Sequence, residues 1–210
     1  MDLRLLIGLI GLLYIVVFGV MALLRREGLS IRFAVEAVVL TAFVVILVWL
    51  TRIQIHPVLF LLLLYVITLR VRIFVDLANV FARRGNYVQA ERIYDFASHV
   101  GPDQTSDLII KVNHAIMLLQ KNQVNESISM FTEVLSQANQ GYLGVKYEAA
   151  AHFNLGVAYL RNNNASMAIV EFNAVLDTWP ASLYARRAQE ALERQRHKNN
   201  TVAEDKPADQ

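Results

Sequence analysis

Two long apolar stretches at the start of the chain restrict what it can fold into. Residues 5–24 contain no charged side chain, and residues 33–50 are interrupted only by Glu36. A helix needs about 20 apolar residues to cross a hydrocarbon layer about 30 Å thick, so each stretch predicts a membrane-spanning helix. A third and shorter apolar segment, residues 55–69, predicts a further crossing. We therefore expect residues 1–69 to form a transmembrane region.

Two other interpretations of this region are weighed beside the first. A buried soluble hairpin is disfavoured, because the rest of the chain is too small to bury so much apolar surface. A cleaved signal peptide over residues 1–22 would use Val20-Met21-Ala22 as its cleavage site. The apolar run of a signal peptide usually has about 7–15 residues, and the run in this chain is longer. The segment before it has no net side-chain charge, whereas that of a signal peptide is positive. Both interpretations rank below three transmembrane helices.

The arginines predict an orientation for these helices. One side of the membrane would carry Arg25, Arg26, Arg32, Arg70 and Arg72, and the other only Arg4 and Arg52. Because cytoplasmic loops carry an excess of Lys and Arg, we expect three crossings, an outside N-terminus and a cytoplasmic C-terminal domain. This is the topology of a multi-pass integral membrane protein.

The charged residues near the ends of the apolar segments have expected roles of their own. Glu36 lies one turn after Arg32, which predicts an ion pair at the interface. A glutamate inside a membrane segment is also a functional hypothesis, which stays open here. Arg70 and Arg72 are expected to extend their long side chains to the lipid headgroups.

The balance of positive and negative residues in the rest of the chain argues against one class of partner, the nucleic acids. Residues 70–210 carry fifteen Lys or Arg and fifteen Asp or Glu, so the net charge of +2 lies in the membrane region. Nucleic acids need a dense basic patch, so we expect no nucleic-acid partner. The chain has no cysteine, and its five histidines share no ligand spacing. We therefore expect no metal, no cofactor, no small-molecule substrate and no catalytic residue.

Beyond residue 70 a repeated pattern of small and aromatic residues appears at helical spacing. One copy contains Leu77, Ala78, Phe81, Gly85, Tyr87, Ala90, Tyr94, Ala97 and Pro102. A second contains Leu155, Gly156, Tyr159, Asn163, Ala165, Ala168, Phe172, Val175 and Pro180 at the same offsets. A weaker middle copy contains His114, Ala115, Leu118, Asn122, Val124, Ser127, Phe131 and Val134, and no proline closes it.

This pattern resembles the tetratricopeptide repeat, a helix–turn–helix unit of about 34 residues. The resemblance covers about residues 71–180 and implies an all-α solenoid. Its repeats would span about 71–104, 108–141 and 149–182, inside a domain of residues 70–196. Residues 182–196 are expected to form a capping helix, and the polar residues 197–210 a disordered tail. About seven extra residues around 141–147 separate the second repeat from the third.

The resemblance also implies a binding groove, since in this family the first helix of each pair lines a concave face that holds peptides or helices. The first repeat would contribute Arg72, Val75, Asp76, Asn79 and Arg83. The second would contribute Ile109, Val112, Asn113 and Ile116, and the third Ala150, Phe153, Asn154, Val157 and Arg161. Some members clamp a C-terminal carboxylate with cations in this groove, but Val75, Ala150 and Asn154 stand where those cations would be needed.

The row of Asn79, Asn113 and Asn154 has two interpretations. An amide both donates and accepts, so the row can pair with the backbone of an extended peptide. Alternatively, these asparagines solvate the groove or hydrogen-bond within the repeats. The sequence leaves both open.

The function expected from these features is that of a non-catalytic, membrane-tethered adaptor. Its partners would be the lipid bilayer and a protein or peptide held in the groove. No Gly or Pro lies between Pro57 and Gly85, so the third membrane helix is expected to continue into the first repeat helix. The alternative is a subunit or assembly factor of a larger membrane complex, in which Gly8, Gly11 and Gly19 would permit close helix packing.

Overall fold

The computed structural model describes residues 3–27, 30–51, 53–138 and 143–204, with side chains as far as residue 198. Over these residues the protein consists of ten α-helices and contains no strand, which confirms the all-helical prediction. The helices group into two compact units, Met1–Ile110 and Lys111–Gln210. The division falls within a helix of the middle repeat, whereas the sequence suggested a division at residues 69 and 70.

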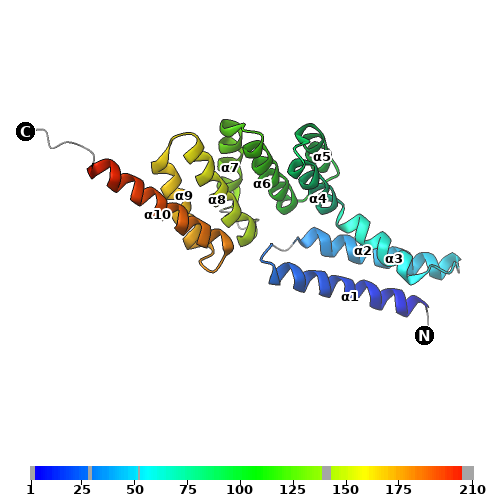
Figure 1. Ribbon diagram of the computed structural model, residues 1–210. Coiled ribbons are helices and arrows are strands. Elements are labelled where there is room, and N and C mark those ends of the chain that lie inside the picture. Colours follow the sequence, from blue (N-terminus) through cyan, green and yellow to red (C-terminus); the bar gives the residue numbers. More distant parts are fainter. Residues whose placement is uncertain (1–2, 28–29, 52, 139–142, 205–210) are drawn as a thin grey trace, which may run out of the picture. The chain divides into compact units, whose positions relative to one another are not determined.

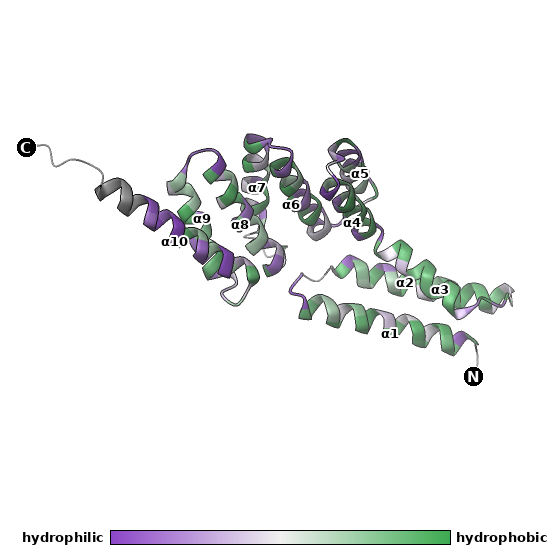
Figure 2. Ribbon diagram, viewed as in Figure 1, coloured by the Kyte–Doolittle hydropathy of each residue, from purple (hydrophilic) through white to green (hydrophobic). Residues whose placement is uncertain are grey.

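The first unit combines the apolar helices with the first soluble hairpin (Figure 1). Its helices are α1 (Leu3–Leu24), α2 (Ile31–Thr51), α3 (Pro57–Thr68), α4 (Arg70–Arg83), α5 (Tyr87–His99) and the start of α6 (Gln104–Gln120). Figure 2 shows that α1, α2 and α3 are hydrophobic along most of their length, while α4 and α5 alternate between hydrophobic and hydrophilic residues.

Two of these helices, α1 and α2, are long and apolar enough to cross a membrane. They span about 30 Å at 1.5 Å per residue, which matches the hydrocarbon layer. The helix α3 has only 12 residues and reaches about 18 Å. It counts as a third candidate span only together with α4, from which it is bent by 72°.

The bend between α3 and α4 shows that the predicted continuous helix is wrong. The two helices meet at Leu69, whose backbone leaves the helical conformation with φ −107° and ψ 15°. No Gly or Pro causes this break. It is a tertiary effect, because Arg70 at the start of α4 is held by partners on α2 and after α5, and these lie off the line of α3.

The membrane helices pack through a small apolar core and one close approach. The buried core is Ile7, Tyr14, Ala37, Val44, Val48, Phe60 and Leu64. A Cβ atom at Gly11 would overlap the side chain of Thr41, so α1 and α2 approach each other there through the glycine. Gly8 and Gly19 have no such neighbour within 4 Å. Gly11 therefore allows the close approach of α1 and α2, while close packing of Gly8, Gly11 and Gly19 against another subunit stays a prediction.

The second unit contains the remainder of α6, then α7 (Val124–Ala138), α8 (Val145–Arg161), α9 (Ala165–Thr178) and α10 (Leu183–Glu204). The helix α10 packs against α8 and α9, in the place expected for a capping helix. It continues to Glu204, past residue 196, so residues 197–204 are helical where the sequence predicted a disordered tail. Residues 139–142 and 205–210 lie outside the described residues. Of the insertion predicted around residues 141–147, residues 141 and 142 lie there, and residues 145–147 form the start of α8.

The same turn closes all three helical hairpins. A residue with positive φ stands at each turn: Gly85 at 77°, Asn122 at 67° and Asn163 at 56°. The residue after it donates its amide to a carbonyl five positions earlier, as in Asn86 to Phe81 (3.0 Å), Gln123 to Leu118 (2.9 Å) and Asn164 to Tyr159 (2.8 Å). This hydrogen bond satisfies a free carbonyl at the helix end.

The buried positions repeat as well. The second helix of each hairpin buries a small residue and then an aromatic one: Ala90 and Tyr94, Ser127 and Phe131, Ala168 and Phe172. The facing small residues, Ala78, Ala115 and Gly156, are also buried. At Gly156 a Cβ atom would lie 2.7 Å from Cε1 of Phe172, which explains why this position has no side chain. The sequence pattern therefore marks the residues that join the two helices of each hairpin.

Candidate functional site

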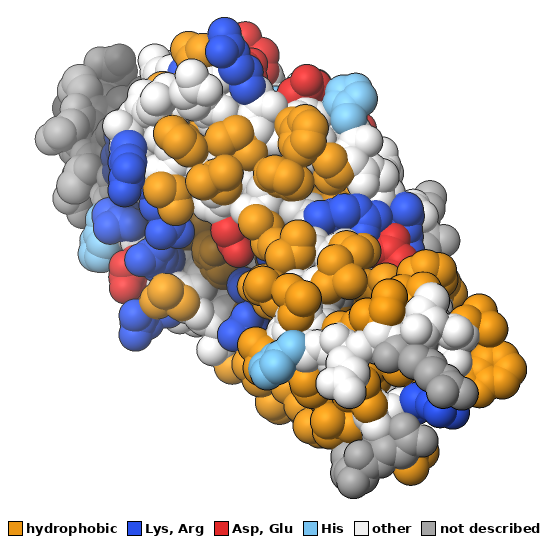
Figure 3. All heavy atoms as spheres, turned by 90° about the vertical axis from the view of Figure 1, so that its right-hand side faces the viewer, with side chains coloured by type: hydrophobic (Ala, Val, Ile, Leu, Met, Phe, Trp, Pro, Cys, Tyr) orange, Lys and Arg blue, Asp and Glu red, His pale blue; other side chains and the backbone are white. Residues whose placement is uncertain are grey.

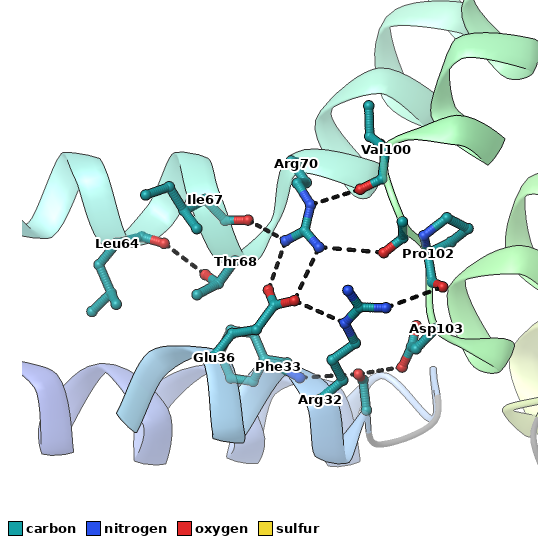
Figure 4. A network of polar contacts seen from close by, with 12 residues as sticks. Arg32, Phe33, Glu36, Leu64, Ile67, Thr68, Arg70, Val100, Pro102 and Asp103 are labelled. Carbon is teal, nitrogen blue, oxygen red and sulfur yellow. Dashed lines mark hydrogen bonds and ion pairs between the residues drawn. The ribbon is translucent and has the colours of Figure 1, made fainter. Parts of the chain in front are cut away.

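The densest polar cluster of the first unit surrounds Glu36 and Arg70. The Arg70 guanidinium donates to both carboxylate oxygens of Glu36, from Nη1 at 2.6 Å and from Nη2 at 2.9 Å. Arg32 donates from Nε to the same carboxylate at 2.8 Å, which confirms the predicted ion pair one turn away. Figure 4 shows Arg70 reaching Glu36 from the start of α4 and Arg32 reaching it from the neighbouring turn of α2. The two parallel hydrogen bonds between Arg70 and Glu36 fix the orientation of the guanidinium relative to the carboxylate.

Arg70 also connects α4 to the loop that follows α5. Its Nε donates to the carbonyl of Val100 at 3.0 Å and its Nη2 to that of Gly101 at 3.3 Å. Arg32 reaches the next carbonyl, that of Pro102, at 3.3 Å. One side chain therefore joins α2, the start of α4 and the loop after α5. Arg70 was expected to reach lipid headgroups, and instead its side chain is only a quarter exposed.

Two helix caps meet beside this cluster. Ser30 caps α2 by accepting a hydrogen bond from the amide of Phe33 at 3.1 Å. Asp103 caps α6 by accepting from the amide of Ser106 at 3.0 Å. The Ser30 hydroxyl also donates to the Asp103 carboxylate. A side-chain oxygen satisfies the open amides at a helix start, so each cap stabilises its own helix and the pair holds the two starts together.

The caps also set the charge state of Asp103. Half-burial raises the pKa of Asp103, but the hydrogen bonds that its carboxylate accepts from Ser106 and Ser30 outweigh this effect. The pKa therefore lies below the usual aspartate value. The carboxylate is therefore ionised at neutral pH and accepts hydrogen bonds from the Ser106 amide and the Ser30 hydroxyl.

A second ion pair ties the loop between α1 and α2 to α4. Glu27 is 3% exposed, and its carboxylate accepts from Nη2 of Arg72 at 2.5 Å. A buried charge is stable only with a partner, so Arg72 fixes the end of α1 relative to α4. The cluster of Ser30, Arg32, Glu36, Arg70, Val100, Gly101, Pro102 and Asp103, together with this pair, is called the polar junction below.

The sequence did not reveal most of the polar junction. Glu36 and Arg70 are separated by 34 positions, and Glu27 and Arg72 by 45. The one available signal was the presence of two acidic residues in an apolar region with arginines at its far end, because isolated charges in such a region need partners.

The predicted groove residues lie on the first helix of each hairpin. Arg72, Val75, Asp76, Asn79 and Arg83 lie on α4; Ile109, Val112, Asn113 and Ile116 on α6; and Ala150, Phe153, Asn154, Val157 and Arg161 on α8. Val75 (3% exposed), Val112 (1%) and Ala150 (4%) belong to the core. Asp76 and Arg83 are exposed, and Phe153 forms ring contacts with Phe172 and Tyr184. A groove continuous over three hairpins stays a prediction.

The asparagine row is partly engaged within the hairpins. The Asn79 carbonyl accepts from the Tyr94 hydroxyl at 2.5 Å, and Asn154 donates to the Ala150 carbonyl at 2.8 Å. Burial raises the pKa of Tyr94, which therefore stays protonated and donates this bond. Arg161 donates to the carbonyl of Leu119 at 2.6 Å and so satisfies the end of α6. These bonds correspond to the second interpretation of Asn79 and Asn154 given above.

Two further ionisable residues pair between the helices of the third hairpin. His152 and Glu171 lie 2.7 Å apart between α8 and α9. Among the described residues no three His, Cys, Asp or Glu side chains gather where they could hold a metal ion.

Fold and site together define the class of this protein: an all-helical chain with two N-terminal helices able to cross a membrane, joined to helical hairpins through a polar junction. Comparison of the chain with protein-family models, curated proteins and solved structures finds no match.

Proposed function

We propose that this protein is a membrane-tethered adaptor whose tetratricopeptide-like hairpins bind a protein or a peptide. The observation that carries the proposal is the identical turn in three successive hairpins, each with the same buried positions. A hairpin of this size cannot bury its apolar face alone, and stacked repeats of this kind characteristically present extended binding surfaces. We propose no catalytic activity, cofactor or small-molecule substrate.

The proposed topology has three crossings, an outside N-terminus and a cytoplasmic repeat domain. Arg70 follows the third apolar segment and binds Glu36 near the start of α2, so the segment 53–69 returns over most of the depth that α2 covers. The arginines in the loop between α1 and α2 and those at the start of α4 then lie on the same side of the membrane, as the positive-inside rule predicts. The absence of cysteine allows a direct test with Gln54→Cys and Ser129→Cys variants. An impermeant maleimide added to intact cells should label position 54 and leave position 129 unlabelled; the reverse pattern refutes this orientation.

The groove can be tested with paired asparagine substitutions in the full chain. Asn113→Ala with Asn154→Ala removes the two amides of the second and third hairpins. Asn125→Ala with Asn173→Ala is the matched control, because both residues are exposed and lie on the second helices of their hairpins. Each form is purified from native membranes and its co-purifying proteins are identified by mass spectrometry. We expect the first pair to lose a partner that the control retains. Equal recovery by two folded variants would refute groove binding.

The alternative function, a subunit or assembly factor of a larger membrane complex, is favoured by one observation. Gly8 and Gly19 lie three turns apart on one face of α1, and a Cβ atom at either position would meet no other part of the chain within 4 Å. Such small residues on a membrane helix permit the close approach of another helix. If Gly8→Leu with Gly19→Leu abolishes co-purification while the groove pair does not, the membrane helices hold the partner and the alternative replaces the adaptor.

A further inference from the structure

The first hairpin exposes apolar side chains at positions that the third hairpin buries. On α4, Leu77 is 43% exposed and Val80 is 42% exposed. The equivalent residues of α8 are Leu155 and Ala158, which are 2% and 0% exposed. In the second unit α7 packs against α8 and covers this face. In the first unit α4 follows the bend at Leu69, and no soluble helix precedes it to cover the same face.

The second helix of the first hairpin adds to this exposed apolar area. Val88 is 59% exposed and Phe96 is 52% exposed, and the Phe96 ring contacts Phe74 of α4 at a centroid distance of 4.8 Å. The third hairpin has Ser166 and Ala174 at the equivalent positions. The first hairpin therefore carries large apolar residues where the same fold elsewhere uses a polar or a small one. Leu77, Val80, Val88 and Phe96 are called the apolar face of the first hairpin.

Arg70 shows in which direction this face points. Leu77 follows Arg70 by seven residues, which is about two helical turns, so the two side chains project from the same side of α4. The Arg70 side chain ends on Glu36 of the membrane helix α2. The side of α4 that carries Leu77 is consequently the side that faces the membrane helices.

The bend sets α4 close to the plane of a bilayer. If α3 runs near the membrane normal, a helix bent from it by 72° lies within about 20° of the membrane surface. Figure 3 looks at the first unit from the side on which α2 and α3 are joined, with the membrane helices in its lower part. Hydrophobic side chains gather on the upper part as well, over the first hairpin, so they face the same side as the membrane helices.

We propose that the apolar face of the first hairpin is inserted into the interfacial layer of the bilayer, next to the membrane helices. A helix that lies in this layer buries its apolar side at the boundary of headgroups and acyl chains and keeps its charges in water. Arg84 and Arg92 are exposed on the same hairpin and reach the level of anionic headgroups. The inference rests on the proposed insertion of α1–α3 in a membrane.

The test uses single cysteines in the full chain, which has none of its own. An environment-sensitive fluorophore is attached to Leu77→Cys and Phe96→Cys, and to the matched control Ser98→Cys, which is exposed on α5 and projects from the side opposite Phe96. A fourth variant, Val39→Cys, places the label on the exposed side of α2. Each protein is reconstituted in vesicles of phosphatidylcholine and phosphatidylglycerol, with and without nitroxide-labelled phosphatidylcholine as the quencher.

We expect nitroxide lipid to cause a large loss of fluorescence at positions 77, 96 and 39, and little loss at position 98. Quenching at position 39 without quenching at 77 and 96 would overturn the inference and leave membrane insertion intact. No quenching at any position would overturn insertion as well. Labels at 77 and 96 that lipid does not quench, but that native membranes shield from aqueous iodide, would identify a protein partner in place of lipid and overturn the inference.

Discussion

The first and third hairpins share a turn and a pattern of buried residues but differ in their surroundings. Gly85 and Asn163 occupy the same left-handed turn position, and Tyr94 and Phe172 fill the same interior position. Yet Leu77 is exposed where Leu155 is buried. The repeat pattern therefore determines how two helices form a hairpin, while the neighbouring element determines which outer face is buried. In the first hairpin that neighbour is α2, which is joined to α4 through the ion pair of Glu36 and Arg70.

The strongest test of this difference compares two phenylalanines. Phe172→Ala removes a ring that is 0% exposed and should destabilise the protein by about 3–5 kcal/mol. Phe96→Ala removes a half-exposed ring and should cost about 1 kcal/mol, mainly from its contact with Phe74. Thermal unfolding of the full chain in detergent, followed by circular dichroism, measures both. Equal shifts of the melting temperature would mean that the apolar face of the first hairpin is already covered in detergent.

The junction of the first hairpin has its own expected effect. Glu36→Gln removes the charge that Arg70 binds through two hydrogen bonds, and the opening of this junction should become easier by about 2 kcal/mol. Arg32→Gln is the control, because its ion pair is nearly half exposed and contributes about 0.5 kcal/mol or less. Hydrogen exchange of the first turn of α4, measured by mass spectrometry in detergent, reports the opening. Faster exchange in α8 and α9 than in α4 would contradict a role confined to the junction.

A smaller effect is expected from the position at which the two helices of each hairpin pack against each other. Gly156→Ala places a Cβ atom against the buried Phe172 ring, which costs about 1–3 kcal/mol and offsets the gain of about 1 kcal/mol that alanine gives in a helix. The first hairpin already holds Ala78 at this position, so Ala78→Gly should lose about 1 kcal/mol. Opposite substitutions should thus both lower the melting temperature. A rise with Gly156→Ala would show that the third hairpin can shift to the spacing of the first.

The smallest effect concerns acid pH at the polar junction. The pKa of Asp103 is lower in the folded protein than in an unfolded chain, so ionised Asp103 stabilises the fold above the usual aspartate pKa of about 4. This contribution is lost as the pH falls through the folded pKa. Asp103→Asn should therefore lower the melting temperature at neutral pH, and the gap to the unaltered protein should narrow below about pH 4. A gap that stays constant with pH would exclude the charge of Asp103 as its cause.

Much of this architecture could be predicted because it depends on local patterns. The apolar stretches gave helices within a few residues of α1, α2 and α3, and the helical spacing placed the turns at Gly85, Asn122 and Asn163. The pairing of Arg32 with Glu36 followed from their spacing of one turn. In each case the residues that interact lie within one helix or one hairpin, where the sequence order fixes the geometry.

The rest depends on contacts between distant parts of the chain. The break at Leu69 has no Gly or Pro to mark it in the sequence. In the structure Arg70 binds the Ile67 carbonyl at the end of α3, and also Glu36 and the carbonyls after α5, which are distant in sequence. The helical state of residues 197–204 was also missed, because their polar composition indicated disorder. For Asn79 and Asn154 the spacing allowed a binding role and an internal role, and only their neighbours in space separate the two.

The pairing of Glu36 with both Arg32 and Arg70 has a consequence for how the chain is made. Arg70 is added 34 positions after Glu36, so at about 5–20 residues per second the ribosome supplies it about 2–7 s later. During that interval Arg32, four positions earlier, is the partner already present to neutralise the glutamate before α2 takes up its proposed place in the lipid. The arrival of Arg70 then completes the pairing and fixes the start of α4 before the rest of the first hairpin is made.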